Sequence, residues 1–188
     1  MTKLRIEKVG LIANYSKQGD WAFKLAFETA RSNNLQLNIF HFLESPYDVS
    51  FDMIPSEIPV QCREEKELIE RDRSLREYYD ELLEDYIDVG FRICEKGRHN
   101  YELKQCLKDK EYQLLIIPYL KTGVSFGNMP IEEFAYRFIA PVILVGPDQK
   151  DEFHVNPPAK ILIDSATLDL ETWKSMRKPT SFQELTVI

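Results

Sequence analysis

At residues 9–16 the chain reads VGLIANYS, an apolar run that ends in a polar turn and leads into a helix-like segment. The same order returns at residues 114–146, where the apolar LLIIPY is followed by a glycine-bearing loop, a second helix-like segment and the apolar PVILVG. Near-continuous apolar runs of this length are typical of strands that are covered on both faces, as in a parallel sheet. Together, the two segments predict an α/β fold of the kind that binds nucleotides.

The rest of the chain alternates between strand-like and helix-like patterns. Alternating or continuous apolar residues predict strands, and apolar residues at helical spacing predict helices. In chain order the predicted elements are strand 9–13, helix 19–33, strand 37–43, helix 64–88, strand 90–95, helix 101–110 with Asn100 as its N-cap, strand 114–117, helix 130–139 and strand 142–145. This alternation predicts an α/β protein with a doubly wound, five-stranded parallel sheet and helices on both faces.

The length of the chain predicts one domain with an appendage. Residues 1–149 form the predicted domain, and residues 150–188 form a C-terminal extension that packs on the domain or on a dimer partner. Within the extension, KILID at 160–164 predicts a short strand, and residues 168–176 predict a short helix. The proline-containing segment 45–62 predicts a long loop, which is either a functional cover or a mobile connector.

The composition argues against several classes of protein. The net charge of −7 argues against nucleic-acid binding, which usually needs a basic face. No apolar run approaches the roughly 20 residues that span a bilayer, so we expect no membrane contact. No apolar signal segment follows Met1, and the predicted location is therefore cytoplasmic.

Residues with chemical reactivity are scattered along the chain. The three cysteines and three histidines show no metal-type spacing and no pairing of a nucleophile with a base. The sequence therefore predicts no metal site and no catalytic residue, and it favours a protein that is not an enzyme. An enzyme limited to slow ATP hydrolysis is the alternative.

Two segments stand where a ligand of this fold would bind. Ligands of parallel α/β sheets bind outside the carboxyl ends of the strands, where the strand order reverses, and this rule points to residues 14–16 and 118–128. Asn14 and Ser16 either contact a ligand or form a turn that caps the following helix. The segment from Gly123 to Asn128 either binds an anion at the start of the next helix or simply connects two elements.

Several short segments, taken in order, resemble the universal stress protein family over roughly Lys8 to Val145. PVILV at 141–145 is the closest literal match, NYS at 14–16 stands where members usually have Asp-Gly-Ser, and HF at 41–42 stands where they often have His-Val. The resemblance implies an ATP site at the glycine-bearing loop. It also implies a homodimer in which two copies pair through their last strands, here Val142–Val145.

The chain departs from the family's phosphate-binding pattern, G-x2-G-x9-G-[ST]. Pro118 stands where the pattern has its first glycine, and proline has no N–H. The segment from Pro118 to Gly127 is shorter than in the pattern, and Asn128 replaces Ser or Thr. Asn14 takes the place of an Asp and brings no charge. We therefore expect a non-catalytic stress-response regulatory protein with no cofactor, whose ATP binding is weakened or lost. It would act through dimerisation and an unidentified protein partner.

The alternative is an adenine-nucleotide-binding switch, in which the shortened loop still holds ATP. The residues that would line its site are Asn14, Ser16, Phe42 through its backbone, Gly123, Gly127 and Asn128.

Overall fold

A computed structural model describes residues 5–48, 65–94, 98–165 and 180–181 of the chain. Its elements are β1 (Lys8–Ile12), α1 (Lys17–Asn33), β2 (Gln36–Phe42), β3 (Tyr47–Asp48), α2 (Glu65–Leu83), β4 (Val89–Cys94), α3 (His99–Lys108), β5 (Leu114–Pro118), β6 (Ser125–Phe126), β7 (Met129–Pro130), α4 (Ile131–Arg137), β8 (Val142–Val145), β9 (Phe153–Val155), α5 (Pro157–Asp164) and β10 (Thr180–Ser181). The predicted α/β class is confirmed. None of the described helices is long and apolar enough to cross a membrane.

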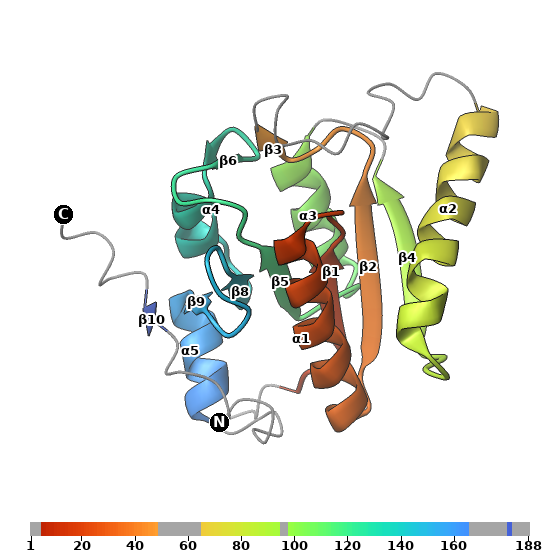
Figure 1. Cartoon of the computed structure of the whole chain (residues 1–188). Helices are drawn as coiled ribbons and strands as arrows, with labels where there is room; N and C mark the ends of the chain where they lie inside the picture. Colours follow the sequence, from red (N-terminus) through yellow and green to blue (C-terminus); the bar gives the residue numbers. More distant parts are fainter. Residues whose placement is uncertain (1–4, 49–64, 95–97, 166–179, 182–188) are drawn as a thin grey trace.

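The central sheet has the strand order β10-β9-β8-β5-β1-β2-β4 (Figure 1). The five strands from β8 to β4 are parallel to one another, while β9 runs antiparallel to β8. In the register, Leu11 of β1 lies between Ile39 of β2 and Ile116 of β5. From β1 the chain goes first to β2 and β4 on one side and then to β5 and β8 on the other. The strand order therefore reverses between β1 and β5, which is where such sheets bind ligands.

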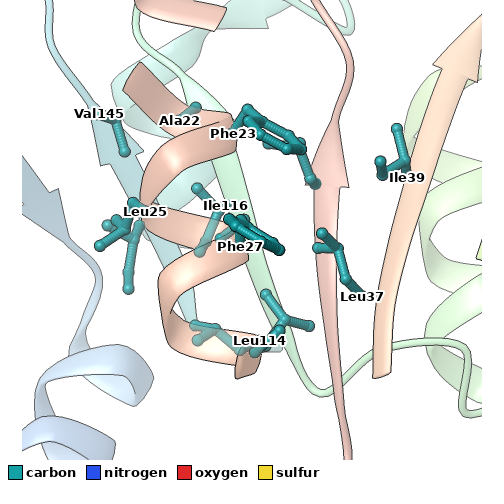
Figure 2. Close-up of a cluster of buried hydrophobic side chains, with 14 of the residues drawn as sticks. Ala22, Phe23, Leu25, Phe27, Leu37, Ile39, Leu114, Ile116 and Val145 are labelled. Carbon is teal, nitrogen blue, oxygen red and sulfur yellow. The ribbon is translucent and has the colours of Figure 1, made fainter. Parts of the chain in front are cut away.

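The two faces of the sheet carry separate apolar cores. Leu11 and Ile39 face a core shared with α1, α2 and α5, whereas Ile12 and Phe40 face a core shared with α3 and α4. Neighbouring residues of a strand point to opposite faces, so a strand covered on both sides must be apolar throughout. Figure 2 shows the first core, whose labelled side chains are Ala22, Phe23, Leu25, Phe27, Leu37, Ile39, Leu114, Ile116 and Val145.

The end of the described chain differs from the sequence prediction. The sheet has seven strands rather than five, because β9 and β10 extend it. The predicted strand at 160–164 is wrong, since these residues belong to α5. Asn156 caps that helix through a bond from the Ala159 N–H to its side chain, and Pro157 and Pro158 fit the first helical turn. The helix predicted at 168–176 lies outside the described residues.

The outer side of β8 is occupied by β9. The two strands pair antiparallel, with Leu144 opposite His154. That side of β8 is therefore not open to a second copy of the chain, and the predicted dimer pairing through Val142–Val145 does not fit this arrangement.

Two further predictions are corrected near α3 and in the 45–62 loop. The N-cap of α3 is Arg98 rather than Asn100, because the helix already begins at His99, and the Asn100 side chain donates to the Gly127 carbonyl. The start of the predicted loop contains β3, where Tyr47 pairs with Phe126 of β6. The remainder of that loop, residues 49–62, lies outside the described residues.

Candidate functional site

The turn after β1 forms the cap of α1. The Ser16 Oγ accepts a hydrogen bond of 3.0 Å from the Gly19 N–H, as an N-cap side chain does. The Asn14 carbonyl lies so close that a Cβ atom on Gly19 would be only 1.7 Å from its oxygen. Of the two interpretations of this turn, the structure thus shows the contacts of a helix cap, and a ligand on Asn14 or Ser16 stays a prediction.

The loop between β5 and α4 has an unusual backbone. Gly123, Gly127 and Asn128 all adopt positive φ angles, of 74°, 57° and 68° respectively. Glycine and asparagine are the residues that adopt this region at low cost. The loop also contains β6 and β7, which pair with each other, and β6 pairs with β3 on its other side. The glycines therefore allow a small three-stranded sheet to form next to the carboxyl end of β5.

The N–H groups of Gly123 and Gly127, two candidates for a phosphate cradle in this loop, already donate to oxygen atoms of the chain. The Gly123 N–H donates to Glu132 Oε1 at 2.7 Å, and the Tyr119 hydroxyl donates to the same oxygen. The Gly127 N–H donates to the Pro46 carbonyl at 2.8 Å. The Glu132 carboxylate thus accepts a bond from the Gly123 N–H, a group that was predicted as a possible donor to an external anion.

Phe42, Gly127 and the start of α3 come together on the α3 side of the sheet. The Phe42 ring contacts the His99 ring edge-on, with the centroids 5.1 Å apart. The Asn100 side chain donates to the Gly127 carbonyl at 3.2 Å, and a Cβ on Gly127 would lie 2.7 Å from Asn100 Oδ1. Asn128, the last of the predicted site residues, is exposed. The contacts of Ser16 are with α1, whereas those of the loop glycines are with α3, with α4 and with Pro46, the residue before β3.

The connection from β8 to β9 reaches the place where the strand order reverses. The Gln18 side chain of α1 donates to the Pro147 carbonyl at 2.9 Å. Gly146 has a φ of +111°, and a Cβ there would lie 2.7 Å from the Tyr119 carbonyl oxygen. The backbone of this connection thus packs directly against the end of β5, at the position where a ligand of this fold would be expected.

Sequence reasoning missed the residues that occupy these donors. Glu132 lies within the predicted helix 130–139, and Pro46 lies within the predicted loop 45–62. Neither residue forms a recognisable motif with the glycine that it contacts. A donor–acceptor pair of this kind cannot be recognised from the sequence, because it depends on the folded path of the loop.

The described residues contain no group of three His, Cys, Asp or Glu side chains that could hold a metal ion. Comparisons with protein-family models and with curated proteins found no match to this chain. The resemblance to universal stress proteins therefore depends on the sequence segments alone, and family membership stays a prediction.

Three buried tyrosines should make the fold sensitive to alkaline pH. Burial raises the pKa of Tyr47, Tyr112 and Tyr119 above the ordinary value, and the hydroxyls of the first two donate to backbone carbonyls. The native state therefore holds these three protons more tightly than the unfolded state does. The contribution of the three hydroxyls to the free energy of unfolding is complete below about pH 10 and is lost as the pH rises above it.

The free energy of unfolding, measured with urea, should thus be lower at pH 11 than at pH 9. Tyrosinate absorbance from these residues should appear together with loss of the circular dichroism signal. Full ionisation of all the tyrosines near pH 10 in a protein that stays folded would contradict the burial of these hydroxyls.

Proposed function

We propose that this protein is a non-catalytic regulatory protein of the universal stress type that has lost ATP binding at its glycine loop. It acts through self-association and contacts with a protein partner. The order of its parallel strands is compatible with the family proposal, because the first strand lies at the centre, as in the dinucleotide-binding doubly wound fold. The loss of ATP binding is supported by one observation above all, the bond between the Gly123 N–H and the Glu132 carboxylate.

This bond opposes a nucleotide in two ways. A phosphate cradle needs backbone N–H groups that point at the anion, and those of Gly123 and Gly127 already have acceptors. A phosphate at the same donor would also meet the negative charge of Glu132. Two like charges about 4 Å apart repel by about 4 kcal/mol at an effective dielectric constant of about 20. ATP would thus have to displace a satisfied carboxylate and remain beside it.

Thermal melting with ATP, ADP and AMP, each with and without Mg²⁺, tests the proposal. A ligand with a Kd of about 1 mM, added at about 10 mM, stabilises a protein by about 1.4 kcal/mol. For a chain of this length that equals a rise of several degrees in the melting temperature. We expect no rise for the wild type with any of the three nucleotides.

Two variants make the result specific to the loop. Glu132→Gln removes the charge but keeps the shape of the side chain. Gly127→Val puts a branched side chain at a φ of 57° and brings its Cβ to 2.7 Å from Asn100 Oδ1, so the loop or Asn100 must shift. A saturable rise in the wild type that Gly127→Val abolishes, with the fold intact, would reject the proposal. That result would establish the nucleotide-binding switch instead.

A further inference from the structure

Strand β4 forms one edge of the central sheet. Among the described residues it pairs only with β2, from Leu37 opposite Val89 to Phe42 opposite Cys94. Figure 1 shows it as the last strand on that side. The carbonyls of Asp88 and Cys94 accept bonds from the β2 side. Backbone groups of successive residues point to alternate sides of a strand, so those of Val89, Phe91 and Ile93 point away from β2.

Strand β4 contains no proline, lysine or bulge, the features within a strand that often block an edge. Helix α2 packs beside it, with the Arg76 guanidinium 4.8 Å from the centre of the Phe91 ring. The sequence of β4 is VGFRIC, and its single charge, on Arg92, pairs with Glu111 and lies 4.0 Å from Glu102. The residues from Val89 to Ile93 are partly exposed, and Ile87 just before them is 95% exposed. The edge is thus apolar and carries outward-pointing backbone donors and acceptors.

A groove of about 480 Å³ lies beside this edge. It is lined by Asn38, Phe40, Gly90, Phe91, Arg92, Ile93 and Glu111. Gly90 keeps the groove open, because a Cβ at that position would lie only 2.3 Å from Asn38 Oδ1. The Arg92 guanidinium is flanked by the two carboxylates of Glu102 and Glu111. Arg92 and Glu111 line the groove, and Glu102 lies next to Arg92 outside that lining; the three side chains together carry a net charge of −1 and suit one further cation.

We propose that β4 pairs antiparallel with β4 of a second copy of this chain, about a two-fold axis that passes through Phe91. In this register Phe91 faces the partner's Phe91, and Val89 faces the partner's Ile93. Phe91 then exchanges both backbone hydrogen bonds with its counterpart. Aromatic and β-branched residues in direct opposition stabilise an antiparallel pair.

The same register brings a second cation next to the groove. It places Gly90 opposite the partner's Arg92, at a position where side chains of an antiparallel pair come closest. The partner's guanidinium can then enter the groove beside Glu111, where a cation is needed. Because the interface is two-fold symmetric, each copy donates one Arg92 and receives one. This self-complementarity favours a second copy over an unrelated extended peptide.

The inference rests on the self-association in the proposed function and names its surface, but it does not depend on nucleotide binding.

Sedimentation of the full chain from about 1 to about 300 µM tests it with two matched double variants. Val89→Lys/Ile93→Lys places like charges opposite each other twice, and Val89→Glu/Ile93→Lys places opposite charges there. We expect a wild-type dimer, a dimer constant about tenfold or more weaker for the Lys/Lys variant, and recovery in the Glu/Lys variant.

Circular dichroism and melting of each variant confirm that it is folded. If the Lys/Lys variant fails to fold, amide hydrogen exchange of the wild type gives the answer. Exchange at Phe91 should slow as the protein concentration rises, while exchange at Arg92, which bonds to β2, should not change.

A wild type that stays monomeric at the highest concentration overturns both the interface and the proposed self-association. A folded Lys/Lys variant that dimerises as well as the wild type overturns the interface alone, as does a folded Glu/Lys variant that fails to recover dimerisation. Melting of the same wild-type protein with ATP tests the loss of nucleotide binding separately.

Discussion

Asn156→Ala is expected to lower the free energy of unfolding by about 4 kcal/mol, because four buried groups lose their partner at once. Asn156 lies fully buried between β9 and α5. Its Oδ1 accepts from the N–H groups of Val142 and Ala159, at 2.9 and 3.0 Å. Its Nδ2 donates to the carbonyls of Ala135 and Ala140, at 3.0 and 2.9 Å. This single side chain thus connects α4, β8 and α5.

Urea unfolding followed by circular dichroism measures the effect. Lys160→Ala, on the exposed side of the same helix, is the control and should change stability by less than about 0.5 kcal/mol. Asn156→Asp keeps the shape but replaces two donors with acceptors and buries a charge, so it should also destabilise strongly. A loss below about 1 kcal/mol for Asn156→Ala would show that water or other groups replace the four bonds.

Gly19→Ala should have the second-largest effect, a loss of about 3 kcal/mol. Helix propensity predicts the opposite sign, since alanine is favoured over glycine inside a helix by about 1 kcal/mol. Gly19, however, lies in the first turn of α1, and a Cβ there would lie 1.7 Å from the Asn14 carbonyl oxygen. Because that oxygen belongs to the backbone, the turn between β1 and α1 must move, and the Ser16 cap bond to the Gly19 N–H moves with it.

Gly123→Ala is the matched control for this substitution. A Cβ at Gly123 has no atom within 4 Å, so only the positive φ of 74° opposes it. We expect a loss of about 1 kcal/mol there, clearly smaller than at Gly19. Equilibrium unfolding of the two variants side by side decides between the steric and the propensity arguments. A Gly19→Ala protein more stable than the wild type would contradict the close packing of the turn.

The central part of the fold could be predicted because its signals are local. The apolar segments that form β1, β5 and β8 are bounded by turn residues, as buried strands are, and the helices between them show apolar residues at helical spacing. The run KILID at 160–164 was ambiguous, since a short apolar segment fits a buried strand and a helix equally well. The cap at Asn156 and the two prolines after it were the local signals that favoured a helix.

The position of the candidate site stays a prediction from the rule for parallel sheets. The structure shows the reversal of strand order on which that rule depends, between β1 and β5. The partners of the loop donors could not be predicted, because Glu132 and Pro46 reach the glycines only through the folded path of the chain. The strand β9 was missed because three residues, Phe153–Val155, are too few to show a period.

The most direct test of this account is a titration of the ¹⁵N-labelled full chain with Mg-ATP, observed at the amides of Gly123 and Gly127. We predict that neither amide resonance moves along a saturable curve up to about 10 mM ATP, a concentration that fills most of a site with a Kd near 1 mM. The Glu132 carboxylate and the Pro46 carbonyl would then still hold these donors. Saturable shifts of both resonances, with the rest of the spectrum unchanged, would contradict the account and show that the loop binds a nucleotide.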